Sequence, residues 1–259
     1  MSVAARKPGT SSRGIALGYV AMLPLLLAYE AGARGGMRNV GEMLVFLPLG
    51  SAASTARLPI VVAVALAALW NLFRAGLGRG DAGLVPRIWR ILLEGAIAAL
   101  LLGPALLLAL DLLGVQPRPG ELAFPRTGEA PPLAVGAFLA GGAAWEEIVF
   151  RIGVQSLVFL AARHALSFLT ASPGVARAGA DVLSIAAGAA VFAASHLAVF
   201  TQVLGPGGER FAPAVFTWRL LAGMLLGALF RWRGPGVAAW AHALFDLFLA
   251  IGAGPDVFL

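Results

Sequence analysis

Residues 133–151 read LAVGAFLAGGAAWEEIVFR, an apolar run that ends in two adjacent glutamates and an arginine. An ionisable side chain within a membrane segment is costly and marks a candidate functional site. Glu146, Glu147 and Arg151 place three such groups within six positions. This stretch therefore predicts both a membrane-spanning helix and a polar site within it.

The composition of the 259-residue chain is that of a membrane protein. Hydrophobic residues make up 59% of it and charged residues only 12%, against about 25% charge in soluble domains. Long apolar runs recur along the sequence and do not alternate with polar residues, which favours spanning helices over a β-barrel. The sequence therefore predicts an all-α polytopic membrane protein, a bundle of seven to eight transmembrane helices. The absence of cysteine excludes disulfides, thiolate metal sites and cysteine nucleophiles.

The chain divides into a basic N-terminal tail, residues 1–14, and a single membrane domain, residues 15–259. Residues 43–49 are too short to span and are expected to be interfacial or re-entrant. Residues 172–181 are expected to form a loop. Residues 154–169 leave more than one interpretation open, because they could form an interfacial amphipathic helix or continue the fourth helix. If they do not cross the membrane separately the chain has seven spans, and if they do it has eight. Spans are expected at residues 15–29, 58–73, 91–115, 133–151, 182–200, 217–230 and 237–251.

The basic residues predict the orientation of the chain. The net charge is +6, but the arginines are spread over short loops, so we expect contact with the lipid bilayer and no nucleic-acid partner. The tail and the arginine-rich residues 74–90 belong in the cytoplasm, because cytoplasmic loops carry an excess of basic residues. The abundance of Arg, Ala and Gly is typical of a GC-rich bacterial genome. We therefore expect a multi-pass protein of a bacterial inner membrane with a cytoplasmic N-terminus.

The two glutamates of the opening stretch are not equivalent on a helix. Glu147 and Arg151 are four residues apart, so they share a face and can form an ion pair. Glu146 lies on a different face and is expected to stay free. The alternative, that these charges only reach toward the membrane interface, is less consistent with a carboxylate pair flanked by aromatic residues.

Two further apolar segments contain histidine. Phe192 and His196 are four residues apart and share a helix face, as do His242 and Asp246. A single histidine in an apolar helix is usually a core hydrogen-bonding residue, and a carboxylate one turn away can fix its tautomer. Such polar groups in three separate segments strengthen the case for a shared site, because each needs a partner within the bundle.

A carboxylate with two imidazoles is compatible with two chemistries. In the first, Glu146 is the general base that activates a water, His196 assists it, and His242 stabilises the developing oxyanion. In the second, the same three residues bind a metal such as zinc, which activates the water. Serine catalysis is less favoured, because no G-x-S-x-G motif occurs and Ser195 directly precedes His196.

The three motifs occur in the order Glu-Glu-x-x-x-Arg, Phe-x-x-x-His and His-x-x-x-Asp. In this order they resemble the CAAX-protease and bacteriocin-processing family of intramembrane endopeptidases, over residues 140–250. The resemblance implies a helical bundle with a conical cavity open toward the cytoplasm, and a catalytic half at about residues 133–251. It also implies a peptide or membrane-associated protein as substrate. No cofactor is favoured, with zinc as the alternative.

The resemblance also implies a role for each motif residue. Glu146 and His196 would activate the water, and His242 with Asp246 would form the oxyanion site. The family often carries asparagine at the last position, whose amide can donate a hydrogen bond, whereas a carboxylate donates only when protonated. We therefore expect Asp246 to orient His242 and to hold it charged.

The remaining motif residues would support the site. The resemblance assigns a structural role to Glu147 and Arg151, and Phe192 is expected to support the histidine on its face. Two alternative functions remain open from the sequence. One is a non-catalytic protein of the same fold, such as an immunity factor or scaffold. The other is an ion-coupled transporter, because proton relays also use membrane-embedded Glu, His and Asp.

Overall fold

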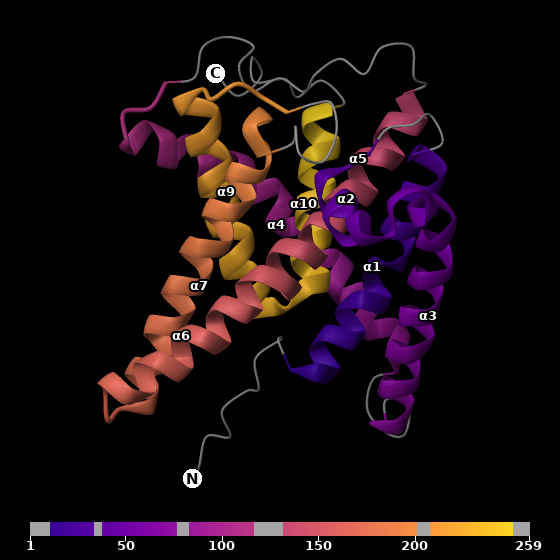
Figure 1. Cartoon of the computed structure of the whole chain (residues 1–259), viewed down its shortest axis with the longest axis horizontal. Coiled ribbons are helices and arrows are strands. Elements are labelled where there is room, and N and C mark those ends of the chain that lie inside the picture. The colour runs from indigo at the N-terminus through magenta and orange to yellow at the C-terminus, as the bar shows by residue number, and fades with distance from the viewer. Residues whose placement is uncertain (1–10, 34–37, 77–82, 117–131, 201–207, 251–259) are drawn as a thin grey trace.

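The structure is a computed structural model that describes residues 11–33, 38–76, 83–116, 132–200 and 208–250. Within these ranges all the named regular elements are helical (Figure 1). In chain order they are α1 (Ser12–Gly32), α2 (Val40–Phe46), η2 (Leu47–Ala52), α3 (Ala53–Arg74), α4 (Leu84–Leu112), α5 (Pro132–Glu146), η3 (Glu147–Gln155), α6 (Ser156–Leu169), α7 (Pro173–Ser195), α9 (Pro213–Arg233) and α10 (Pro235–Ala250).

Six helices among the described residues are long and apolar enough to cross a membrane. They are α1, α3, α4, the continuous helix Leu133–Leu169, α7 and α9. The helix α10 is apolar but shorter, at 16 residues. The prediction of an all-α polytopic membrane protein is therefore confirmed.

The predicted end of the fourth span at Arg151 is wrong. The helix continues through η3, a π-helix, into α6, so that residues 133–169 form one helix of 37 residues. Residues 154–169 thus continue the fourth helix, one of the interpretations that the sequence left open, and form neither a separate interfacial helix nor a separate crossing. The helix continues because a partner compensates the arginine charge within the bundle, so the arginine does not have to lie at an interface.

The loop expected at residues 172–181 is also wrong, because α7 already begins at Pro173. The side chain of Ser172 accepts a hydrogen bond from the Val175 amide at 3.4 Å and caps the helix. Proline is favoured at the first helical position, where its missing N–H costs nothing. The local sequence Ser-Pro is therefore a helix start, and the helix ends at Ser195 instead of at residue 200.

The short elements α2 and η2 connect α1 to α3 without spanning, as predicted for residues 43–49. Asn39 caps α2, because its Oδ1 accepts from the Gly41 amide at 2.8 Å. A Cβ atom at Gly41 would lie 2.7 Å from the backbone nitrogen of Glu146. The glycine therefore allows α2 to pack directly on the backbone at the end of α5.

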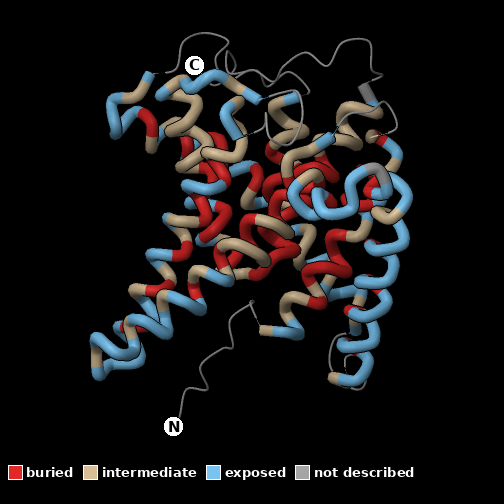
Figure 2. The backbone as a smooth tube through the Cα atoms, viewed as in Figure 1, coloured by how far each residue is buried: buried red, intermediate tan, exposed pale blue. Residues whose placement is uncertain are grey.

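The helix α5 lies at the centre of the bundle and packs against α1 and α10. A Cβ atom at Gly141 would lie 2.3 Å from Cβ of Tyr29 in α1, so the two helices touch through their backbones. Figure 2 shows the buried residues gathered in this centre, whereas the outer helices α3, α6 and α7 are largely exposed. Exposed apolar residues such as Leu66 and Trp70 in α3 match a surface in contact with lipid.

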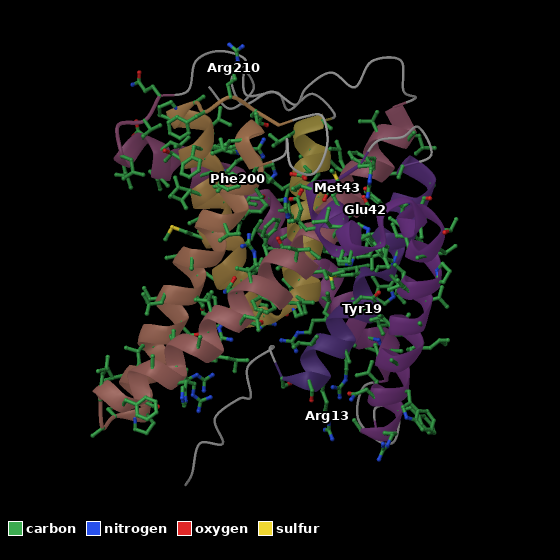
Figure 3. The ribbon with its side chains drawn as sticks, viewed as in Figure 1. Arg13, Tyr19, Glu42, Met43, Phe200 and Arg210 are labelled. Carbon is green, nitrogen blue, oxygen red and sulfur yellow. The ribbon has the colours of Figure 1, made fainter. Side chains whose placement is uncertain are left out.

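The two ends of the bundle can be told apart by the residues that lie there. Figure 3 shows Arg13, near the start of α1, at one end and Arg210 at the other. We refer to these as the Arg13 end and the Arg210 end. The turn between α9 and α10 lies toward the Arg13 end, where Gly234 adopts φ 94° and Arg233 bonds Glu94 of α4. The helices α7 and α10 both run toward the Arg210 end (Figure 1).

Candidate active site

Three helices bring the predicted carboxylate and imidazoles together. Glu146 is the last residue of α5, His196 follows α7 directly, and His242 lies in the middle of α10. Oε1 of Glu146 lies 3.9 Å from Nε2 of His196, and Oε2 lies 3.7 Å from Nε2 of His242. The two oxygens of one buried carboxylate thus face two different imidazoles.

The backbone fixes the tautomer of His196. Its Nδ1 lies 2.8 Å from the carbonyl oxygen of Phe192, which can only accept, so Nδ1 carries the proton. The neutral ring therefore directs the lone pair of Nε2 toward Glu146. Both atoms are acceptors, and their separation of 3.9 Å is too long for a direct hydrogen bond. The arrangement suits one water that donates a hydrogen bond to each.

Glu147 orients the ring of His242. Nδ1 of His242 lies 3.0 Å from Oε1 of Glu147, which is fully buried. Oδ2 of Asp246 lies 3.6 Å from Nε2, the nitrogen that also faces Glu146. The expected orienting role of Asp246 therefore belongs to Glu147, because a contact at hydrogen-bond distance fixes the ring and a longer one does not. Asp246 instead shares with Glu146 the space in front of Nε2.

The predicted ion pair between Glu147 and Arg151 is present. Nε of Arg151 lies 3.3 Å from Oε2 of Glu147, and both side chains are completely buried. The guanidinium carbon also lies 5.2 Å from the ring centroid of Phe192, within the range of a cation–π contact. Within the described part of the chain, no nitrogen of this guanidinium has a geometrically good hydrogen-bond partner. Its charge is therefore compensated by one carboxylate and one aromatic face.

Phe192 packs against both imidazoles. Its ring centroid lies 4.9 Å from that of His196 and 5.8 Å from that of His242, both in edge-on geometry. Phe150 packs against the same ring at 5.4 Å. The residue predicted to support His196 is thus placed to fix the separation of the two imidazoles.

Glu146 has a partner that the sequence analysis missed. Nδ2 of Asn39 donates a hydrogen bond to its Oε1 at 2.7 Å, so the expectation of a free carboxylate is wrong. Asn39 precedes α2 and is 107 residues away along the chain. The signal in the sequence, an asparagine before a short apolar segment, indicates a helix cap and gives no indication of a distant carboxylate.

The candidate metal ligands do not form a metal site. Among the described residues, no group of three or more His, Cys, Asp or Glu side chains is arranged to hold a metal ion. Glu146 directs one oxygen toward His196 and the other toward His242. The zinc alternative therefore stays a prediction.

The residues of α10 around the site are more exposed on the side of the Arg210 end than on the side of the Arg13 end. Ala238, one turn before His242, is completely buried, whereas the side chain of Asp246, one turn after it, is 18% exposed. The side chain of His196 is 16% exposed and lies beside Glu209 and Arg219.

The C-terminal half of the chain matches a known family. Residues 128–248 match the family described as type II CAAX prenyl endopeptidase Rce1-like. We refer to residues 128–248 as the Rce1-like segment. No curated protein and no solved structure matches the chain significantly. The Rce1-like segment contains every motif residue of the site, whereas Asn39 lies outside it.

Proposed function

We propose that this chain is an intramembrane endopeptidase that hydrolyses a peptide bond with a water activated by Glu146 and His196. The observation that carries the proposal is the Glu146 carboxylate between two imidazoles, at 3.9 Å from His196 and 3.7 Å from His242. The Rce1-like segment supports an endopeptidase, and the apolar helices around the site support catalysis within a membrane.

The first step is attack by water. An oxygen about 2.8 Å from both Glu146 Oε1 and His196 Nε2 would donate one hydrogen to each. Glu146 takes a proton as the oxygen attacks the carbonyl carbon, because a carboxylate at hydrogen-bond distance is a competent general base. A bond forms between the water oxygen and the carbonyl carbon, and the carbonyl π electrons move to its oxygen.

The second requirement is a donor for the resulting oxyanion. In its imidazolium form His242 offers Nε2–H, because Nδ1–H is already engaged by Glu147. The carboxylates of Glu147 and Asp246 compensate that positive charge. A preformed donor of this kind is worth about 10²–10³ in rate. Collapse of the intermediate then breaks the C–N bond, and the proton held by Glu146 passes to the leaving amine.

The substrate we propose is a membrane-associated peptide or a membrane-associated segment of a protein. The site is buried in a bundle of apolar helices, so we propose that the cleaved segment reaches it in contact with lipid or with the bundle. Precursors of secreted peptides are a suitable chemical class. The prenylated substrate in the family description is not expected of a bacterium.

We also propose a bacterial inner membrane with the N-terminus in the cytoplasm. The Arg13 end carries Arg74, Arg87 and Arg90, and cytoplasmic ends carry the excess of basic residues. The site would then open to the opposite side of the membrane. The family resemblance implies instead a cavity open toward the cytoplasm. A cytoplasmic N-terminus and a cavity open toward the cytoplasm cannot both hold in this fold.

The test is cleavage of a peptide substrate by the purified chain in liposomes. Glu146→Gln removes the general base without changing side-chain size, and turnover should fall by at least about 10²-fold. Asp111→Asn is the matched control, because it also removes one carboxylate but lies exposed near the end of α4. Full turnover by a folded Glu146→Gln protein would contradict the proposal and favour a non-catalytic protein of this fold.

A further inference from the structure

We propose that Asn39 is a positioning residue for Glu146, supplied to the Rce1-like site by the N-terminal part of the chain. This inference rests on the proposed function. It is carried by a hydrogen bond of 2.7 Å from Asn39 Nδ2 to Glu146 Oε1. That oxygen is the one that faces His196.

The orientation of the Asn39 amide is determined by its other contacts. Its Oδ1 accepts a hydrogen bond from the Gly41 amide at 2.8 Å, so the oxygen must face the start of α2. The NH₂ group therefore faces Glu146 and can only donate. The backbone N–H of Asn39 donates to the hydroxyl of Tyr29 at 2.9 Å.

A charged cluster anchors the segment that carries Asn39. Glu42 is completely buried and forms ion pairs with Arg38 at 3.2 Å and with Arg57 at 3.3 Å. Arg57 also pairs with Glu30 of α1 at 2.6 Å. Two arginines and two glutamates thus join α1, the start of α2 and α3. Figure 3 labels Glu42, which is a residue of α2.

The cluster reaches Asn39 through Tyr29. The Tyr29 hydroxyl lies 3.5 Å from Oε2 of Glu42 and accepts the hydrogen bond from the Asn39 backbone. On the other side, Gly41 packs on the backbone of Glu146. The fold therefore holds the Asn39 side chain in place and packs α2 on the backbone of Glu146, which brings the donor amide next to the carboxylate.

The hydrogen bond from Asn39 determines the direction of a lone pair on Oε1 of Glu146. Oε1 accepts from Asn39 on one side, which fixes the rotation of the carboxylate and leaves its other lone pair toward the water position at His196. Asn39 itself does not lie between the imidazoles, so it should affect turnover and leave substrate binding unchanged.

Two substitutions separate this role from helix capping. Asn39→Ser retains a side chain that can cap α2 but is too short to reach Glu146. Asn39→Asp also retains the cap and the size, but replaces the donor by a carboxylate facing a carboxylate. We expect kcat to fall by about 10- to 100-fold in Asn39→Ser with KM unchanged, as for other residues that orient a reacting group. Asn39→Asp should lose at least as much.

The control is Ser172→Ala, which removes the cap of α7 far from the site and should leave kcat unchanged. A wild-type kcat in folded Asn39→Ser, or a rise in KM alone, would overturn the inference while Glu146→Gln still tests the proposed function. Infrared spectroscopy provides a readout without turnover. The carboxylate bands that disappear in Glu146→Gln should shift in Asn39→Ser, and unshifted bands would also overturn the inference.

Discussion

His242 is oriented by Glu147, a residue 95 positions earlier in the chain, through a contact of 3.0 Å between Nδ1 and Oε1. The same glutamate pairs through its other oxygen with Arg151. One fully buried carboxylate therefore both compensates a buried cation and sets the direction of an imidazole. The two adjacent glutamates therefore have different roles. Glu146 faces the two imidazoles, whereas Glu147 contacts His242 and Arg151.

The first prediction concerns the buried charge of Arg151. Glu147→Gln should destabilise the protein by about 3–5 kcal/mol, because it leaves an uncompensated guanidinium in the core. Thermal unfolding in detergent would measure the loss. The double variant Glu147→Gln/Arg151→Met should recover stability and remain inactive, since His242 is still without its orienting carboxylate. Restored activity in that double variant would contradict the orienting role.

A second prediction distinguishes two roles of Asp246. If this residue only shares the space in front of His242 Nε2, an amide there can donate to the oxyanion instead. Asp246→Asn should therefore keep kcat within about tenfold, whereas Asp246→Leu, which offers neither a negative charge to the His242 imidazolium nor a donor to the oxyanion, should lose about 10²-fold. Initial-rate kinetics on both variants would measure this. A loss in Asp246→Asn as large as in Asp246→Leu would show that the negative charge is required.

The third prediction addresses metal dependence. Because no group of three His, Cys, Asp or Glu side chains among the described residues is arranged to hold a metal ion, cleavage should persist after treatment with a strong chelator and dialysis. Elemental analysis of the active protein should find less than one equivalent of zinc. Activity lost on chelation and recovered with added zinc would instead require the three donors to rearrange around an ion.

The fourth prediction concerns the orientation of the chain. Cysteine is absent, so single cysteines can report on each side. Val85 and Leu113 lie at opposite ends of α4, and both are exposed. In intact cells a membrane-impermeant maleimide should label Leu113→Cys and should reach Val85→Cys only after permeabilisation. The reverse pattern would place the open side of the site in the cytoplasm.

Contacts within one helix could be predicted from the sequence. The pair Glu147–Arg151 and the proximity of His242 to Asp246 both follow from a spacing of four residues. The three motifs, each in its own apolar segment, also predicted that α5, α7 and α10 would meet. These inferences depend only on helix geometry and on the cost of an unpartnered charge in an apolar bundle.

Contacts between distant segments could not be predicted in this way. The bond from Asn39 to Glu146 and that from His242 to Glu147 depend on how helices pack, and no periodicity in the sequence encodes that. The helix boundary at Arg151 was wrong for a related reason. A charged residue ends a span only if it needs water, and the pairing that removes this need is decided by tertiary structure.

The π-helix η3 lets the side chains of α5 and those of α6 be oriented independently, although both belong to one long membrane helix. A continuous α-helix would tie the direction of every side chain in α6 to that of Glu146, since each residue adds a fixed rotation of about 100°. The wider winding of residues 147–155 changes that rotation between the two parts. The side chains of α5 can thus be oriented as hydrolysis requires, whereas those of α6 are oriented by contact with α7 and lipid.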